Sequence, residues 1–414
     1  MKIAFSLLIL TILIALLTDR FLNEEWSKKS QDRPIIERRL ALFYFRFLPW
    51  IFTVGTLFLY FYPKIYNYNN LYPVFNWFFL ISILLYIPKF TSATYLLSIR
   101  VGQGPIYDRS EYHYPKLTWD NFMSKMGIVV ATAPFVSLVF GVFKGRYNFR
   151  TERIEIPFTN LPNEFDGLKI VQISDLHLGS FGKNREPLQK AIKMINAEKP
   201  DIILFTGDIV NNFAEEIDGW EEHFQKLKAP LGKFSILGNH DYGNYSNWAS
   251  EKEKQENFQK IIEGNRRLGF HLLRNENITI EKYGATIGLA GVENWSLATK
   301  HPRKGNLRKT TKGIENQPFS ILMSHDPSHW DEKVIKHNFY DLTLSGHTHG
   351  MQFGIEKGNF RWSPAQYVVK RWAGLYQEGN KYLYVNRGLG YLGMPARVGM
   401  PPEITVINLV SKAA

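Results

Sequence analysis

Long apolar runs separated by basic loops occupy the first third of the chain. Four runs stand out, at residues 3–18, 41–62, 71–88 and 126–143, and they are rich in Phe, Tyr and Trp near their ends. A hydrocarbon core of about 30 Å needs roughly 20 residues of helix to cross it. Any one run is also typical of a buried helix in a soluble domain. Four of them within 150 residues predict a polytopic membrane region of about four helices.

The first run also has a feature of a secretory signal, because Lys2 precedes the apolar stretch. The segment 16–19 that ends the run lacks the small residues that a signal peptidase cleaves after, so we expect this helix to be retained.

The loops between the runs predict the orientation of the region, since Lys and Arg are retained on the cytoplasmic side. The first loop carries seven Lys and Arg residues between 20 and 46, and the third carries five between 89 and 125, whereas 63–70 carries only Lys64. Four spans then place the following domain outside the cytoplasm, although four basic residues after the last run favour the opposite side: Lys144, Arg146, Arg150 and Arg153. We expect a multi-pass protein of the cell (plasma or inner) membrane with an extracytoplasmic second domain.

From about Arg150 the pattern changes to short apolar runs that alternate with polar stretches of helical period. The apolar runs predict strands at 168–174, 202–206, 234–237, 319–324 and 342–345. The polar stretches predict helices at 186–198, 215–228 and 251–268. The chain therefore divides into a membrane region at 1–150 and an α/β domain at 151–414.

Charge follows the same division. The formal net charge is +12, but residues 1–150 hold 17 Lys and Arg against 8 Asp and Glu, whereas 151–414 hold 33 against 30. Nucleic acid needs a concentrated basic surface, so the nearly balanced second domain makes nucleic acid an unlikely partner. The one basic low-complexity stretch, 300–313, is either a solvated loop or a contact for phosphate or an anionic membrane surface.

Five blocks of potential metal ligands follow five of the predicted strands. The chain has no cysteine, so nitrogen and oxygen must hold any metal. Side chains two positions apart in an extended segment point the same way. Asp175 and His177 can therefore converge on one point, and so can His347 and His349. Singly each block has an ordinary explanation as a turn or a helix cap, but together they predict a metal site. The blocks are Asp175 with His177, Asp208, Asn239 with His240 and Asp241, His325, and His347 with His349.

These blocks resemble the pattern of the calcineurin-like metallophosphoesterases: Asp-x-His, Gly-Asp, Gly-Asn-His-Asp, a lone His and Gly-His-x-His. Every element is present over about residues 165–355. The resemblance implies two facing β-sheets flanked by helices, and two divalent metal ions, Mn, Fe or Zn. It implies that Asp175, His177 and His349 hold one metal, that Asn239, His325 and His347 hold the other, and that Asp208 bridges them.

The same resemblance implies how the site works. Two cations activate a hydroxide for in-line attack on a phosphoryl group. His240 is expected to touch the phosphate or the leaving group while Asp241 orients its imidazole. The stretch 161–177 and the tail 385–403 look like the branch of membrane-associated bacterial phosphoesterases. Some relatives of that type cleave the pyrophosphate of a diacylated UDP-glucosamine.

Three hypotheses follow for function. The first is a membrane-anchored, two-metal hydrolase of a phosphodiester or pyrophosphate bond in a lipid-linked substrate, with the bilayer and that substrate as partners and no protein partner. The second is a general phosphodiesterase or nuclease with a membrane anchor. The third is a catalytically silent membrane scaffold or sensor, which should have lost ligands.

The sequence leaves the roles of several other side chains open. Asp326 is a candidate to support the ligands, and Arg387 and Arg397 are either phosphate contacts or loop ion pairs. A further group of aromatic residues interleaves with Lys370 and Arg371 and predicts either core packing or an interfacial patch for a lipid substrate. Its members are Trp362, Tyr367, Trp372, Tyr376 and Tyr391.

Overall fold

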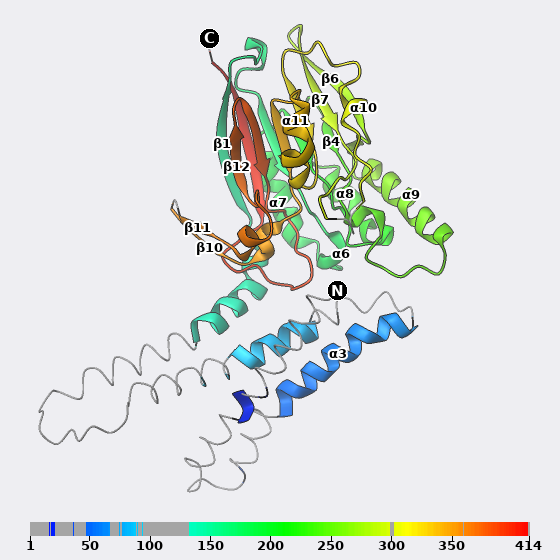
Figure 1. Cartoon of the computed structure of the whole chain (residues 1–414), viewed down its shortest axis with the longest axis vertical. Helices are drawn as coiled ribbons and strands as arrows, with labels where there is room; N and C mark the ends of the chain where they lie inside the picture. The colour runs from blue at the N-terminus through cyan, green and yellow to red at the C-terminus, as the bar shows by residue number, and fades with distance from the viewer. Residues whose placement is uncertain are drawn as a thin grey trace, which may run out of the picture. The chain divides into compact units, whose positions relative to one another are not determined.

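The computed structural model describes residues 47–66, 77–87, 132–298, 302–358 and 360–412, together with positions 16, 18–20, 36, 74, 89 and 93. The chain divides into two compact units, Met1–Phe140 and Gly141–Ala414, which are drawn in Figure 1. The boundary expected from composition, between 150 and 151, lies a little further along the chain.

In the first unit, helix α3 runs over Leu48–Tyr66. It overlaps the expected span 41–62 and continues beyond it to Tyr66, while residues 41–46 lie outside the described part of the chain. No helix within the described part of the chain is both long and apolar enough to cross a membrane. Much of the four expected spans lies outside the described residues: 3–15, 17, 41–46, 71–73, 75–76, 88 and 126–131.

The second unit is built on two six-stranded sheets, as the resemblance implied (Figure 1). The first has the order β1-β14-β2-β3-β4-β5, and β2 to β5 are parallel neighbours. Its strands are β1 Arg150–Phe158, β14 Glu403–Ser411, β2 Lys169–Ile173, β3 Ile202–Phe205, β4 Lys233–Ser235 and β5 His271–Leu272.

The second sheet has the order β12-β13-β9-β8-β7-β6, with β13, β9, β8 and β7 parallel. Its strands are β12 Gly374–Glu378, β13 Lys381–Val385, β9 Leu342–Ser345, β8 Ser320–Met323, β7 Ala285–Gly291 and β6 Glu276–Lys282. A separate hairpin pairs β10 Ile355–Lys357 with β11 Phe360–Trp362.

Alternation along the central strands divides the core into layers. In β3, Ile202 and Leu204 join the cluster between the two sheets, whereas Ile203 and Phe205 join the cluster beneath the helices. Successive side chains of a strand point to opposite faces, and these parallel strands are covered on both. This explains why the strands read as continuous apolar runs in the sequence.

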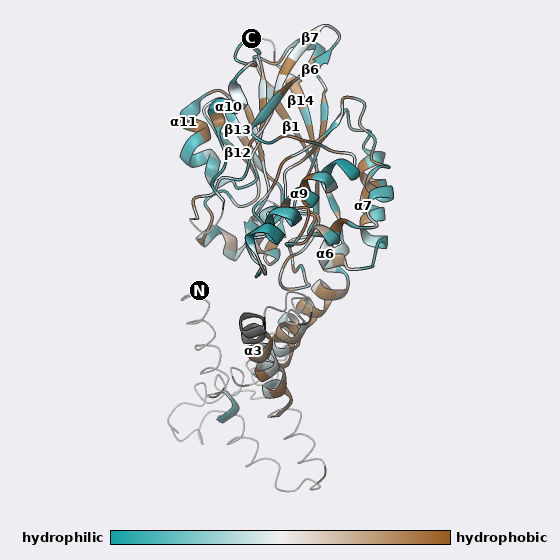
Figure 2. Ribbon diagram, turned by 90° about the vertical axis from the view of Figure 1, so that its right-hand side faces the viewer, coloured by the Kyte–Doolittle hydropathy of each residue, from teal (hydrophilic) through white to brown (hydrophobic). Residues whose placement is uncertain are grey.

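The helices present polar outer faces (Figure 2). Helix α7 places Leu188, Ala191, Ile192 and Ile195 on one buried stripe, the spacing of an amphipathic helix. In α9 the Ser250 side chain accepts from the Glu253 N–H at 3.1 Å and caps the first turn. The α-helices of the unit are α6 Leu178–Phe181, α7 Glu186–Ala197, α8 Glu221–Phe224, α9 Glu251–Arg267, α10 Leu307–Thr311 and α11 Ile335–His337.

Most elements predicted from the pattern are present, but the helix expected at 215–228 is wrong. That stretch forms a short 3-10 turn, η5 Ala214–Ile217, and then α8. Gly219 lies between them with φ +78, a left-handed conformation that interrupts a right-handed helix. Helices expected at 186–198 and 251–268 correspond closely to α7 and α9.

Candidate dinuclear metal centre

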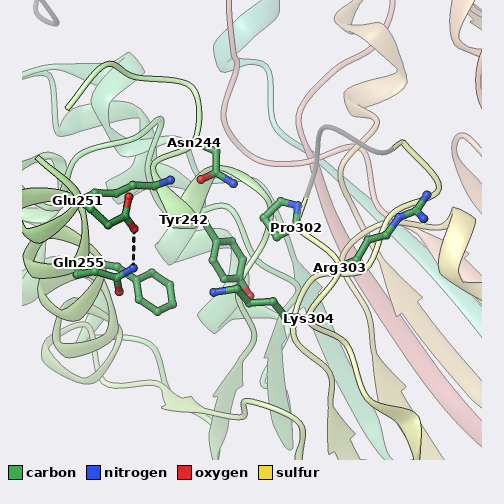
Figure 3. Close-up of a pocket in the computed structure, with 9 residues that line it drawn as sticks. Tyr242, Asn244, Glu251, Gln255, Pro302, Arg303 and Lys304 are labelled. Carbon is green, nitrogen blue, oxygen red and sulfur yellow. Dashed lines mark hydrogen bonds between the residues drawn. The ribbon is translucent and has the colours of Figure 1, made fainter.

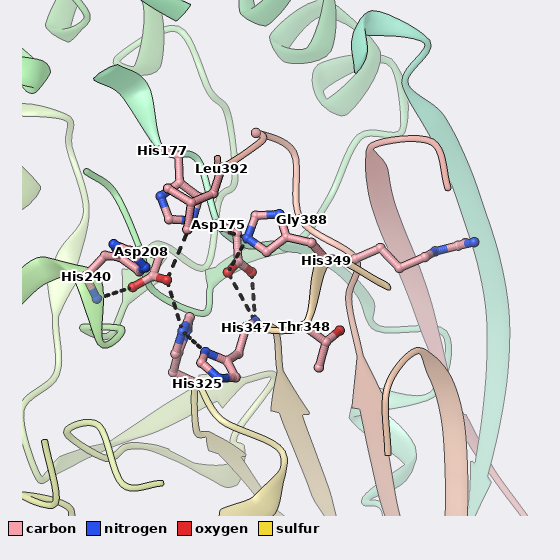
Figure 4. Close-up of polar contacts among 12 residues, drawn as sticks. Asp175, His177, Asp208, His240, His325, His347, Thr348, His349, Gly388 and Leu392 are labelled. Atoms are coloured by element: carbon pink, nitrogen blue, oxygen red, sulfur yellow. Dashed lines mark hydrogen bonds and ion pairs between the residues drawn. The ribbon is translucent and has the colours of Figure 1, made fainter. Parts of the chain in front are cut away.

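All five predicted ligand blocks lie in loops that leave the ends of strands. Asp175 follows β2, Asp208 follows β3 and Asn239 follows β4, while His325 follows β8 and His347 follows β9. Parallel neighbouring strands bring their carboxyl ends to one edge of a sheet. The two sheets together therefore gather side chains that are as much as 174 positions apart in the printed sequence (Figure 4).

The ligand loops carry unusual backbone. Five of the predicted ligands have positive φ: Asp175, His177, Asp208, His347 and His349. Non-glycine residues rarely adopt this region, at a cost of order 1–3 kcal/mol each, and such residues cluster at functional sites. Gly207, with φ +96, precedes Asp208, and a Cβ there would lie 2.5 Å from the Gly238 nitrogen. The close approach of the two Gly-containing loops requires a glycine.

Asp175, His177 and His349 form one group whose ligand atoms all lie within 4.8 Å of one another. The His349 Nε2 atom is 3.3 Å from Asp175 Oδ1 and 3.2 Å from His177 Nε2. All three side chains are buried. These are the three residues that the family resemblance assigns to one metal.

Asp208, His325 and His347 form the second group, also within 4.8 Å of one another. His325 Nε2 lies 3.3 Å from His347 Nδ1 and 3.1 Å from Asn239 Oδ1. His325 Nδ1 contacts the Thr206 carbonyl oxygen at 2.7 Å, which fixes the direction of Nε2. Asn239 thus joins the same cluster through its amide oxygen.

Asp208, a member of the second group, also approaches His177 of the first (Figure 4). Its Oδ2 atom is 3.2 Å from His325 Nε2 and 3.6 Å from His177 Nε2. The backbone N–H of His240 donates to its other oxygen, Oδ1, at 2.9 Å. A carboxylate so placed has the geometry to contact cations in both groups.

The donor set fits divalent cations. Facing ring nitrogens 3.2 Å apart on His177 and His349 need either a proton between them or a cation that both contact. Burial lowers the pKa of His177 to about 3, so this ring is neutral, the form that binds metals. Burial opposes charge on Asp208, but the neighbouring His325 and His240 outweigh it and hold the pKa of that carboxyl well below its usual range. Buried carboxylates, an amide oxygen and imidazoles are suitable ligands for divalent transition metals.

Asp241 has a different contact pattern from the one expected. Its carboxylate accepts from four backbone N–H groups: Asp208 at 3.0 Å, Ile209 at 2.9 Å, Val210 at 3.4 Å and Gly238 at 2.8 Å. The expectation that Asp241 orients the His240 imidazole is therefore wrong. Adjacent residues of the short 3-10 turn η6 His240–Tyr242 point in different directions, and Asp241 instead ties together the loops after β3 and β4.

The His240 ring is held by a backbone carbonyl. Its Nδ1 contacts the Asn211 carbonyl oxygen at 2.7 Å, and the ring stacks on Tyr245 with centroids 4.3 Å apart. An N–H donated to that carbonyl fixes the tautomer and leaves Nε2 unprotonated when the ring is neutral. Asn211 lies in the loop after Asp208 and had no sequence signal as a site residue.

Glu216 is a second residue that sequence reasoning missed. Its carboxylate accepts from the backbone N–H groups of Asn211 at 2.6 Å, Asn212 at 2.9 Å and Phe213 at 2.9 Å, and from Gly179 at 3.0 Å. It therefore fixes the loop whose carbonyl holds His240 and also the loop that follows His177. The only available signal was a charged residue in a turn, which is common on surfaces.

We expect Glu216→Ala to lower kcat about tenfold, because the loss of supporting contacts around an active site usually costs 10-fold to 100-fold. Steady-state turnover of a soluble phosphodiester measures this. The adjacent, exposed Glu215→Ala is the matched control and should leave kcat unchanged. Equal rates for the two variants would contradict the role assigned to Glu216.

Two other charged residues border the ligands. Asp326 Oδ2 lies 3.5 Å from His347 Nε2, in keeping with its expected supporting role. Arg397 is buried, and its Nη2 lies 3.2 Å from His349 Nδ1 while donating to the Gly390 carbonyl at 2.6 Å. Burial lowers the pKa of Arg397 to about 9. Its guanidinium is committed to backbone carbonyls and to His349.

A pocket of about 240 Å³ adjoins the turn that carries His240 (Figure 3). Tyr242 of η6 stacks on Phe258, with centroids 5.1 Å apart, and the Lys304 ammonium lies 4.9 Å from the Tyr242 ring centre. Arg303 and Lys304, which also line the pocket, belong to the basic stretch 300–313. Part of that stretch therefore packs against aromatic rings instead of being wholly solvated.

Comparison with known proteins agrees with this geometry. A family model described as calcineurin-like phosphoesterase matches residues 168–351, and one described as probable calcineurin-like phosphoesterase, transmembrane domain, matches 1–146. An uncharacterized metallophosphoesterase of Bacillus subtilis, YkuE, is 35% identical over 261 residues, which cover 61% of this chain and 82% of that one. A transmembrane protein with metallophosphoesterase domain from Danio rerio is 27% identical over 320 residues, covering 75% and 68%.

The family that the five blocks predicted is confirmed by these matches, and the family uses divalent metals. The match over 1–146 indicates association with a membrane. The chain accordingly belongs to the calcineurin-like phosphoesterases, as a metal-dependent phosphoesterase that carries a transmembrane domain ahead of its catalytic unit.

Proposed function

We propose that this protein hydrolyses a phosphodiester or pyrophosphate bond in a lipid-linked substrate at the membrane surface. The observation that carries the hydrolytic chemistry is Asp208 Oδ2, which lies within 3.6 Å of imidazoles from both ligand groups. A transmembrane-domain match in the same chain supports a substrate that resides in the bilayer. Tethering confines the site to the surface where such a substrate is concentrated.

Asp175, His177 and His349 are proposed to hold one cation, Asn239, His325 and His347 the second, and Asp208 both. Mn, Fe and Zn all accept this mixture of ligands. When bound, two such cations polarise the phosphoryl oxygens and acidify water, so that hydrolysis requires no covalent phospho-enzyme.

The chain's own residues supply orientation and a proton site. His240 Nε2 is the ring atom proposed to contact the phosphoryl or leaving-group oxygen, because Nδ1 is held by Asn211. The Asp241 carboxylate keeps the backbone of the two ligand loops at a fixed separation. Because the His240 ring is already held in one orientation, less conformational entropy must be lost on reaching the transition state.

The test is turnover by the full chain in detergent, with Mn and after chelation. The substrates are an aryl phosphodiester, an aryl phosphomonoester, nucleic acid and a UDP-linked diacylated sugar. We expect metal-dependent hydrolysis with preference for the lipid-linked pyrophosphate. Preference for nucleic acid would favour an anchored nuclease, against which the near-neutral catalytic half already argues. Two bound metals without turnover of any substrate would favour a silent scaffold.

We also propose that the catalytic unit is extracytoplasmic in a multi-pass arrangement, on the distribution of Lys and Arg between the apolar runs. The measurement is labelling of a single cysteine, Tyr283→Cys, by an impermeant maleimide on intact cells. Labelling only after lysis would place the unit in the cytoplasm.

A further inference from the structure

The β10–β11 hairpin has two chemically different faces. Cross-strand partners share a face, and Ile355 pairs with Trp362 while Glu356 pairs with Arg361. One face therefore carries Ile355 and Trp362, joined by Phe353, whose ring lies 6.3 Å from that of Trp362. The other face carries the ion pair Glu356–Arg361.

The apolar face is open to solvent. Phe353 is 44% exposed, Ile355 55% and Phe360 59%. Tyr367 and Val368, at the end of η9 Pro364–Tyr367, are exposed beside Trp362, whose Nε1 lies 3.4 Å from the Tyr367 hydroxyl. We call the following residues the hairpin patch: Met351, Phe353, Ile355, Phe360, Trp362, Tyr367 and Val368.

The polar face fixes the hairpin to the catalytic unit. Glu356 forms ion pairs with Arg361 and with the fully buried Arg387. Because both carboxylate oxygens are committed to these partners, the apolar side chains of the opposite face are held outward. Contiguous exposed apolar patches on soluble surfaces mark sites of contact with another molecule or with a membrane.

A short segment of chain connects the hairpin patch to the metal centre. The 3-10 segment η8, His349–Gln352, connects the ligand His349 to Phe353, so Met351 is only two residues from a proposed metal ligand. The Ser363 hydroxyl donates to the Gly350 carbonyl at 2.7 Å and ties the far end of the hairpin to the same segment. A substrate that contacts the Met351 end of the patch is therefore close to the ligand His349.

The chain also enters the catalytic unit at this edge. Gly354 N–H donates to the Val398 carbonyl at 2.9 Å, and the preceding residue, Arg397, donates its N–H to the Gly141 carbonyl at 3.2 Å. Gly141 is the first residue of the unit and lies within the stretch that matches a transmembrane domain. The same short strip of chain, 397–398, thus contacts both the hairpin and the point of entry.

We propose that the hairpin patch inserts into the interfacial region of the bilayer and admits the lipid end of the substrate to the metal centre. Aromatic and aliphatic side chains accompanied by lysine are the composition of such surfaces, and Lys357, the cross-strand partner of Phe360, is exposed on this face. The substrate half of this inference rests on the proposed function, whereas contact with the bilayer does not.

The absence of cysteine permits a direct test with the full chain. An environment-sensitive fluorophore is attached to Phe360→Cys, with Tyr283→Cys, a position 86% exposed on the β6–β7 turn, as control. Both are placed in nanodiscs of phosphatidylcholine and phosphatidylglycerol with lipids spin-labelled near the headgroup. We expect about twofold quenching at position 360 and none at 283, since interfacial side chains lie at headgroup depth. Equal quenching at both positions, or no quenching at either, would overturn the proposal. A fluorophore at 360 that is shielded from water by a second copy of the chain, without quenching by the lipid spin labels, would also overturn it.

A second arm uses Ile355→Asp combined with Phe360→Asp. We expect about tenfold lower turnover of a lipid-embedded substrate and unchanged turnover of a soluble aryl phosphodiester, since charge opposes insertion of the patch. Tyr283→Asp should change neither. Equal loss on both substrates would overturn the patch as a lipid interface. If the unaltered protein turned over neither substrate, the proposed function would fail while the quenching arm still decided the surface.

Discussion

Asp208→Asn is expected to lower kcat for a soluble phosphodiester by about a thousandfold, the scale of losing a principal source of transition-state charge stabilisation. The amide keeps the volume of the side chain but removes the negative charge that lies 3.2 Å from His325 Nε2 and 3.6 Å from His177 Nε2. Other single ligand substitutions leave one of the two groups intact, whereas this one weakens both. The variant should also bind fewer than two metal ions per chain by elemental analysis.

The matched control is Asp218→Asn, an exposed carboxylate paired with Arg267 on the surface. It makes the same chemical change away from the metal centre and should keep both kcat and metal content. Full activity in Asp208→Asn, with two metals retained, would remove Asp208 from the proposed bridging position. Loss of activity with a lowered melting temperature would indicate unfolding, so thermal unfolding of both variants is measured alongside.

The metal centre could be predicted because its information is local. Each ligand follows an apolar strand by one to a few residues, and parallel strands end at a common edge. His325 is an example. A lone histidine forms no motif, but this one directly follows the apolar run 319–324, which contains β8. What the sequence could not supply is the direction of each side chain in a tight turn, which is why the role of Asp241 was misassigned.

Other features depend on contacts between distant segments. Glu216 acts through four backbone N–H groups, which carry no side-chain signature in a sequence. Arg387 was ambiguous between a phosphate contact and an ion pair, and it is buried among carboxylates from three segments. The aromatic group around Lys370 and Arg371 was predicted to form either core or an interfacial patch, and its members differ. Trp372 is buried, whereas Tyr367 is exposed in the hairpin patch.

Arg387→Met is expected to destabilise the catalytic unit by about 3–5 kcal/mol, the cost of breaking a buried ion pair by removing one partner. The Arg387 and Glu403 side chains are 1% and 0% exposed, and Arg387 also contacts Glu356 and Glu152. Methionine fills much of the space but leaves Glu403 buried with only the Tyr384 and Thr405 hydroxyls, which donate at 2.6 Å and 2.7 Å. Thermal unfolding in detergent, with hydrogen exchange of β14 peptides as a local probe, measures the loss. Arg266→Met, at a surface pair, should change stability by less than about 0.5 kcal/mol.

The direction in which stability changes with pH distinguishes an uncompensated Glu403 charge from a general disruption of packing in Arg387→Met. Burial opposes the charge on Glu403, but Arg387 and the hydroxyls outweigh it and lower the pKa of that carboxyl in the folded protein. Its stabilising contribution is therefore present above the ordinary pKa of a glutamate and lost as the pH falls through the lowered value. In Arg387→Met, burial acts without the guanidinium and favours the protonated form, so the stability gap between variant and parent should narrow from pH 7 to pH 5. Adding Glu403→Gln to Arg387→Met should recover part of the loss and abolish that narrowing. A gap that is constant with pH would mean that the uncompensated Glu403 charge is not the cause.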